Sequence, residues 1–190
     1  MSPGDPPLSH RILSVFAFAI LVAAPAVAEP VCGTETHIRY GETRAYFQDV
    51  WAGCTPTGEC QLSASKIDKT QAVNISHEAR FTLQAGTPLL GLKLMSVTDA
   101  VAIDKPMQLV YGKDSANLTG AVETRGNVVN EYHVKDPAQA DTIARAAIAK
   151  TNVARWIFTT ESGETKTVEL PLRGAAKALD WITCMAKPAH

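Results

Sequence analysis

The chain has 190 residues, a hydrophobic fraction of 46% and a formal net charge of −1, with acidic and basic residues interspersed. This is the composition of an ordinary globular protein that is long enough to bury one sizeable core. Because no basic stripe is present, the sequence argues against nucleic acid as a partner.

The first 28 residues have the pattern of a secretory signal peptide. Arg11 closes a short polar region, residues 12–22 (ILSVFAFAILV) are apolar, and Ala26-Val27-Ala28 is a small-x-small cleavage site. The apolar run is shorter than the about 20 residues that a membrane-spanning helix needs. We therefore expect cleavage after Ala28, a single exported domain over residues 29–190 without an integral membrane segment, and a periplasmic or secreted location.

All four cysteines, Cys32, Cys54, Cys60 and Cys184, follow this signal. An even number of cysteines in an exported chain favours disulfides, and four cysteines allow three pairings. Cys54 and Cys60 flank residues 55–59 (TPTGE), whose proline and glycine indicate a tight loop between two strands. We expect a Cys54–Cys60 bond across this loop and, by elimination, a Cys32–Cys184 bond.

Alternation of apolar and polar residues predicts a series of short strands along the mature chain. The predicted strands cover residues 42–52, 60–64, 79–84, 89–97, 107–111, 118–123, 128–134, 153–160 and 166–172. The segment 89–97 is the most apolar, with Leu90, Leu92 and Leu94 on one face.

Two helices are predicted. The first covers residues 137–150, with Asp136 as its N-cap and Pro137 at its first position. The second covers residues 174–185, with an inward face made of Ala178, Leu179, Ile182 and Met185, and with Trp181 beside it. Because strands and helices do not alternate, we predict an α+β fold. It is mainly antiparallel β, a sandwich or a partly closed barrel, with the two short helices packed against it.

Two segments resemble a known family. The pattern Phe47-x-Asp49-x-Trp51-x-x-Cys54, followed by Cys60-x-Leu62, resembles the opening of the invasion-associated locus B family of small exported bacterial proteins. The helix start Asp136-Pro137, the strand residues Trp156-Ile157-Phe158, and residues 168–174 (VELPLRG) before Ala175, Ala178 and Leu179 resemble its ending. A related uncharacterised periplasmic family of longer chains is also similar.

The sequence departs from the family pattern at three points. Val50 separates Asp49 from Trp51, where the family has the two adjacent, the family's middle cysteines are missing, and Cys32 and Cys184 are additional. The shared motifs are structural, so the resemblance implies a periplasmic or secreted domain rather than a reaction.

No pattern of catalytic or metal-ligating residues stands out. The chain has no Gly-x-Ser-x-Gly motif. The adjacent Ser76, His77 and Glu78 would alternate in direction on a strand and so could not form a local triad, and we interpret them as a polar loop. A thiol nucleophile would require an unpaired cysteine. The histidines His37, His77, His133 and His190 are scattered and form no metal-ligand spacing. We expect no catalytic residue, no metal and no cofactor.

The candidate ligand-facing residues are Trp51, Trp156, Trp181 and His133. Tryptophans on strands and helix faces are more often part of the core, with the indole N–H paired, and His133 is equally consistent with a surface strand position. Both interpretations of these residues remain open at this point.

The hypothesis that these features favour is an exported non-enzymatic domain that mediates protein–protein contact in the bacterial envelope or at a host surface. The sequence identifies neither the protein partner nor the oligomeric state. The alternative is a periplasmic small-ligand carrier or enzyme inhibitor that uses an apolar cleft near the tryptophans. A hydrolase or thiol enzyme is a third, weaker possibility.

Overall fold

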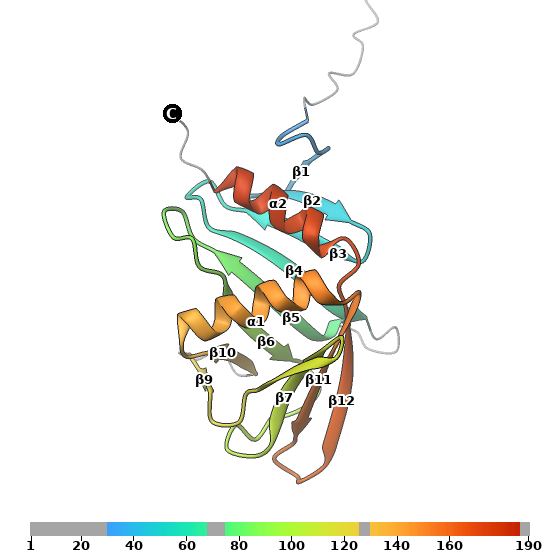
Figure 1. Ribbon diagram of the computed structural model, residues 1–190. Coiled ribbons are helices and arrows are strands. Elements are labelled where there is room, and N and C mark those ends of the chain that lie inside the picture. The colour runs from blue at the N-terminus through green and yellow to red at the C-terminus, as the bar shows by residue number, and fades with distance from the viewer. Residues whose placement is uncertain (1–29, 68–74, 126–129, 187–190) are drawn as a thin grey trace, which may run out of the picture.

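The computed structural model describes residues 30–67, 75–125 and 130–186, so the predicted signal peptide lies outside the described residues. These residues form twelve strands and two helices, and the strands make two antiparallel sheets that do not close into a barrel (Figure 1). The predicted α+β class is therefore confirmed, as a sandwich-like arrangement. No helix in the described ranges is both long and apolar enough to cross a membrane.

The large sheet has the strand order β1-β2-β3-β4-β5-β6-β10-β9. Its strands are β1 (His37–Arg39), β2 (Glu42–Phe47), β3 (Val50–Cys54), β4 (Cys60–Ile67), β5 (Ile75–Leu83), β6 (Gly91–Ser96), β9 (Val122–Thr124) and β10 (Glu131–Val134). The small sheet has the order β12-β11-β7-β8. Its strands are β7 (Met107–Tyr111), β8 (Asp114–Asn117), β11 (Val153–Thr159) and β12 (Thr165–Pro171).

Several predicted strands have different bounds in the structure. The strand predicted over residues 42–52 is two strands, β2 and β3, because the chain reverses at Gln48, which has a φ of 56°. The strand predicted over 118–123 is replaced by β8 and β9, which a turn at Gly120 (φ 66°) separates. Strand β1 was not predicted, because its three residues are too few to establish an alternating pattern.

The two helices are α1 (Pro137–Lys150) and α2 (Ala175–Met185). The bounds predicted for the first helix are confirmed, and Asp136 Oδ1 accepts a hydrogen bond from the Ala138 amide at 2.9 Å. Helix α2 begins one residue later than predicted. It buries Trp181 together with Ala175, Ala178 and Ile182, whereas Leu179 and Met185 are only partly buried.

One face of the large sheet forms the core. Ala52, Leu62, Phe81 and Leu92 lie side by side in register across β3, β4, β5 and β6, and all four are buried. The helices contact the strands on this side, and β12 of the small sheet contacts β4 and β5. The apolar half of each alternating strand is thus removed from water, which is the main driving force for the fold.

Both disulfides join the pairs that were expected from the sequence, Cys32 with Cys184 and Cys54 with Cys60. The Cα atoms are 6.1 Å apart in the first pair and 4.0 Å apart in the second. The indole N–H of Trp181 donates to the Val31 carbonyl at 3.0 Å, close to the first bond. The segment before β1 is therefore fixed to the last helix by a covalent bond and a hydrogen bond.

The two segments that resemble the invasion-associated locus B family contact each other. Both carboxylate oxygens of Asp49 accept from the Arg173 guanidinium, at 2.6 and 2.8 Å, and the Asp49 amide donates to the Arg173 carbonyl at 3.2 Å. Gly174 has a φ of 87°, and a Cβ at this position would clash with the Phe47 carbonyl. The turn after β2 thus needs a glycine at the start of α2.

A candidate binding site on the open face of the large sheet

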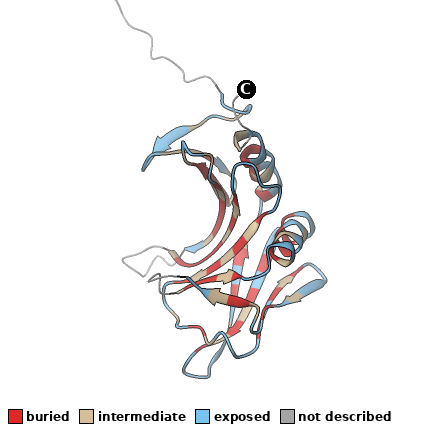
Figure 2. Cartoon of the chain, turned by 90° about the vertical axis from the view of Figure 1, so that its left-hand side faces the viewer, coloured by how far each residue is buried: buried red, intermediate tan, exposed pale blue. Residues whose placement is uncertain are grey.

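The large sheet has a second face, which is turned away from both helices and which we call the open face. Figure 2 shows the strands curving around this side, with the helices behind them. The register places three rows of side chains across it, because alternate residues of each strand share a face. The first row is Tyr46, Trp51, Ser63, Arg80, Lys93 and His133, the second is Arg44, Gly53, Gln61, Thr82 and Gly91, and the third is Ser65, Glu78, Met95 and Glu131.

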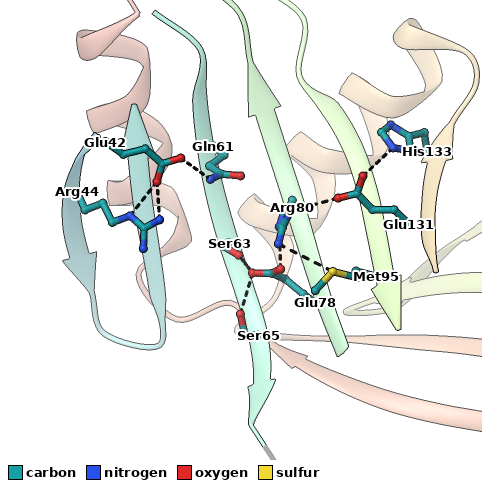
Figure 3. Close-up of polar contacts among 10 residues, drawn as sticks. All are labelled: Glu42, Arg44, Gln61, Ser63, Ser65, Glu78, Arg80, Met95, Glu131 and His133. Carbon is teal, nitrogen blue, oxygen red and sulfur yellow. Dashed lines mark hydrogen bonds and ion pairs between the residues drawn. The ribbon is translucent and has the colours of Figure 1, made fainter. Parts of the chain in front are cut away.

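A buried carboxylate, Glu78 of β5, is the centre of the open face. Its Oε1 accepts hydrogen bonds from the hydroxyls of Ser63 and Ser65, the latter at 3.0 Å, and its Oε2 accepts from Arg80 Nε at 2.7 Å (Figure 3). Only 1% of Glu78 is exposed to solvent. Three donors therefore compensate for the cost of burying this charged group.

The network continues from Arg80 to β10. Arg80 donates to Glu131 Oε1 at 3.2 Å, and Glu131 Oε2 lies 3.1 Å from His133 Nε2. Burial lowers the pKa of His133 below its ordinary value, and the nearby charges of Lys93 and Arg125 act in the same direction, while Glu131 opposes them. The imidazole is therefore neutral at pH 7, with Nε2 as the nitrogen that donates to Glu131.

A second polar cluster lies on β2, β3 and β4. The Glu42 carboxylate accepts from Arg44 Nε at 2.8 Å and from Gln61 Nε2 at 3.1 Å. The Arg44 guanidinium carbon lies 4.3 Å from the centroid of the Trp51 ring, within the range of a cation–π contact. The cluster holds a partly exposed tryptophan in a defined orientation at one side of the open face.

A cavity of about 430 Å³ lies at one end of this face. Its lining includes carboxylate, amide, hydroxyl, amine, guanidinium and imidazole groups, from Glu42, Gln61, Thr82, Lys93, Arg125 and His133. Gly91 forms part of the wall, and a Cβ there would lie 2.5 Å from Thr82 Oγ1. The cavity is thus polar, carries both signs of charge and suits a short polar segment rather than an apolar ligand.

The four candidate ligand-facing residues are divided between the core and the open face. Trp51 and His133 lie on the open face, whereas Trp156 is fully buried and Trp181 is 2% exposed. Trp156 packs between the two sheets, with ring centroids 4.4 Å from Phe158 and 6.1 Å from Tyr132. These two buried tryptophans have the core placement that the sequence analysis kept as an alternative.

Sequence reasoning did not identify Glu78, Arg80 or Glu131 as members of a site. The sequence signal that was available is the alternation in β5. Charged Glu78 and Arg80 alternate there with apolar Ala79 and Phe81, which face the other side of the sheet. The distant Glu131 belongs to another strand, and only the order in which β10 pairs with β6 brings it near Arg80. One sequence alone does not predict that β10 pairs with β6.

A separate polar group surrounds His77, on the opposite side of β5. Its Nε2 lies 3.1 Å from Asp99 Oδ2, and Asp99 Oδ1 accepts from Lys166 Nζ at 2.6 Å. His77 Nδ1 is also 3.1 Å from the Ser76 hydroxyl, a contact that strict alternation does not predict. The reason is a bulge at Ser76, because Ile75 pairs with Ile67 while His77 pairs with Lys66.

The His77 group connects the two sheets. Burial lowers the pKa of His77, and Asp99 opposes this effect. Burial acts to raise the pKa of Asp99, but hydrogen bonds from Lys166 and Thr98 lower it overall. His77 is 6% exposed and packs against the rings of Trp156 and Phe158 in the small sheet. Its surroundings are those of an interior contact between layers.

Two other chemical patterns find no support in the geometry. Ser63 and Lys66 have the Ser-x-x-Lys spacing of some hydrolases, but residues three apart on a strand face opposite sides. In the described part of the chain, no group of three or more histidine, cysteine, aspartate or glutamate residues is close enough to hold a metal ion. All four cysteines are in disulfides.

Comparison with known proteins shows a likeness of fold but not of sequence. No family model and no curated protein sequence matches the chain. The fold is similar to the crystal structure of invasion associated protein B from Bartonella henselae, with a TM-score of 0.57 and 13% sequence identity. The match covers 75% of this chain and 96% of the other. At this identity the likeness shows a shared fold, and it agrees with the resemblance seen in the sequence motifs.

Proposed function

We propose that this protein is an exported non-enzymatic domain that binds another protein through the open face, in the bacterial envelope or at a host surface. The observation that carries the proposal is a network of paired polar groups on the sheet face that is turned away from both described helices. The fold likeness to an invasion associated protein B supports this kind of function. Two disulfides are compatible with a periplasmic or secreted location.

The composition of the open face suits protein recognition. Tyrosine, tryptophan and arginine dominate the binding energy of many interfaces, and Tyr46, Trp51 and Arg44 lie together at one side. The side chains of the Glu78 network are already held by hydrogen bonds, so little conformational entropy is lost on binding. Lys93 forms no ion pair with any residue that the structure describes, and it borders the cavity. A carboxylate of the partner would pair with it.

Site-specific crosslinking tests this proposal. A photoreactive amino acid replaces Lys93 on the open face or, as a matched control, Lys113 in the exposed turn between β7 and β8. After crosslinking in envelope extracts and on host cells, the captured protein is identified by mass spectrometry and purified. We expect an adduct from position 93 and none from position 113.

Titration of the purified partner then measures the contribution of charge. Lys93→Glu should weaken binding by about tenfold or more, while Lys113→Glu should leave it unchanged. Equal effects of the two substitutions would contradict a role for the open face. Turnover of a substrate by the purified protein, at a rate that Glu78→Gln abolishes, would contradict a non-enzymatic function.

A second cavity supports a second candidate function, the carriage of a small amphipathic ligand. It has a volume of about 450 Å³ and lies among the loop after β5, α1 and α2, with a lining that includes Leu83, Pro88, Leu90, Leu179 and Arg145. Its position differs from the cleft near the tryptophans that the sequence suggested. A fluorescent fatty-acid analogue should bind the wild type and not Leu179→Glu, with the exposed Leu89→Glu as a control. A flat titration of the wild type would exclude this function.

A further inference from the structure

The outer strand of the large sheet, β1, has the features of a strand that accepts a partner. In the described ranges it pairs only with β2, at the rim of the sheet (Figure 1). Two apolar side chains in its hairpin are exposed to solvent, Ile38 by 81% and Tyr40 by 82%. Edge strands are commonly protected by charge or proline. The outer strand β12 of the small sheet has both, with Glu169 and Pro171, whereas β1 has one charged residue, Arg39, no proline, and the exposed Ile38 at its middle position.

The backbone groups that β1 leaves free follow from the turn geometry. Tyr40 and Gly41 have φ values of 53° and 78° and form a two-residue loop between Arg39 and Glu42. Arg39 and Glu42 are therefore a hydrogen-bonded pair, and by alternation Ile38 and Thr43 are not. The N–H and C=O groups of Ile38, and of Thr36 before it, consequently point away from β2 toward the free edge.

This edge is held in place before any partner arrives. The residues that lead into β1 form a tight turn, in which Val31 and Thr34 exchange two backbone hydrogen bonds of 3.0 and 3.1 Å. The Cys32–Cys184 disulfide and the bond from Trp181 to the Val31 carbonyl attach this turn to α2. A preorganised edge loses less conformational entropy on pairing than a flexible one.

We propose that two copies of this protein associate through β1, with the strands antiparallel and His37 on the two-fold axis. Thr36 of each copy then lies opposite Ile38 of the other and exchanges backbone hydrogen bonds with it. This register uses the outward N–H and C=O groups of Thr36 and Ile38 described above. The proposal is independent of the function proposed for the open face.

Charge complementarity favours a second copy of this protein as the partner of β1, and it favours this register of pairing. With His37 on the axis, Glu35 lies opposite Arg39 of the other copy, and this cross-strand pair occurs twice. Both residues are exposed, and directly opposite residues of opposite charge stabilise antiparallel pairing. A shift that places Ile38 on the axis instead sets Arg39 opposite His37 and loses both ion pairs. The paired strand is short, so we expect a weak, concentration-dependent dimer.

A cysteine placed on the proposed axis gives the first test. The Cα atoms of two residues opposite each other in a pair without hydrogen bonds are about 4.5 Å apart, within the range of a disulfide. Mature His37→Cys protein should form a covalent dimer under mild oxidation, and Ser115→Cys on the edge strand β8 should not. Intact-mass measurement, followed by peptide mapping without reduction, verifies that the two native disulfides remain. Equal dimer formation by both variants, or none by His37→Cys, would overturn the proposal.

A charge exchange gives the second test. Sedimentation equilibrium should show self-association of the wild type, and Arg39→Glu should raise the dissociation constant by about tenfold. The double variant Glu35→Arg/Arg39→Glu restores opposite charges and should recover the wild-type constant. A wild type that stays monomeric at every concentration, or a double variant as weak as Arg39→Glu alone, would refute the pairing.

Discussion

Two neighbouring residues of β5, His77 and Glu78, belong to polar networks on opposite faces of the same sheet. His77 is sealed between the two sheets, where Asp99 connects it to Lys166 of β12. Glu78 faces the open side, where its partners Ser63 and Ser65 come from β4 and the network continues to β10. Both residues are almost fully buried, and both are paired.

The difference between the two networks is which layers they connect. The His77 group connects the large sheet to the small one, so it depends on the contact between layers. The Glu78 group connects strands within one sheet, so it holds its side chains without a covering layer. The buried carboxylates of the second network fix the more exposed Arg80, and Lys93 beside it is partly exposed as well, so we assign binding to this face.

The largest effect should come from removing the centre of the open-face network. Glu78→Ala leaves Ser63 without its acceptor and Arg80 with only Glu131 as an ionic partner, and we expect the free energy of unfolding to fall by about 3 kcal/mol. Urea denaturation measures this change, with the exposed Glu169→Ala of β12 as a control. A loss no larger than that of the control would mean that the network contributes little to stability.

Removing the carboxylate between the sheets should have a smaller effect. Asp99→Asn weakens the contacts with both His77 and Lys166, and we expect a loss of about 1–2 kcal/mol. Because Lys166 is one-third exposed, its coupling to Asp99 in a double-mutant cycle with Lys166→Met should stay below about 1 kcal/mol. A larger coupling would assign most of the inter-sheet contact to this ion pair.

The two histidines predict how stability depends on pH. Burial lowers the folded-state pKa of His77 and of His133 below the ordinary value of 6.5. Below that pH the unfolded chain therefore binds more protons than the folded chain, so the free energy of unfolding should fall between pH 7.5 and pH 5. Urea midpoints across this range should fall less in His77→Gln and in His133→Gln. If the urea midpoint of both variants depended on pH as strongly as that of the wild type, the two histidines would not be the source of the pH dependence.

The smallest effect is expected at the edge of the Glu78 network. Ser65→Ala removes one of three donors, while Ser63 and Arg80 still satisfy the carboxylate, so we expect a loss of about 0.5 kcal/mol. Thermal unfolding of this variant alongside Glu78→Ala compares a peripheral and a central member of the network. A loss near that of Glu78→Ala would indicate that the serine hydroxyl positions the whole group.

The sequence predicted local features well, because local signals determine them. Asp136 and Pro137 defined the start of α1, and the alternation of Leu90, Leu92 and Leu94 defined the buried face of the strand around β6. The reversal at Gln48 was missed because a non-glycine residue takes a positive φ there, against its ordinary preference. The two core tryptophans, Trp156 on β11 and Trp181 on α2, could not be distinguished from surface ones, because an aromatic residue in a short element fits either face of the local pattern.

The candidate site depends on contacts between distant strands, so it was not predictable in the same way. Arg80 and Glu131 are 51 residues apart in sequence, and they meet because β10 pairs not only with β9, its neighbour in the chain, but also with the distant β6. In contrast, sequence motifs include both Asp49 and Arg173, because each residue lies within a segment that resembles the same family. A motif can mark such a contact even when alternation does not.

The bond between Cys32 and Cys184 has a consequence for synthesis and for proteolysis. Ribosomes make the first cysteine 152 residues before the second, so the turn before β1 stays unanchored until α2 exists. The exposed edge is thus completed last, when most of the sheet is already available to support it. Once the bond has formed, a protease that cuts a single peptide bond between the two cysteines does not separate the fragments. On a denaturing gel, molecules cut once in this way would separate into two fragments only after reduction.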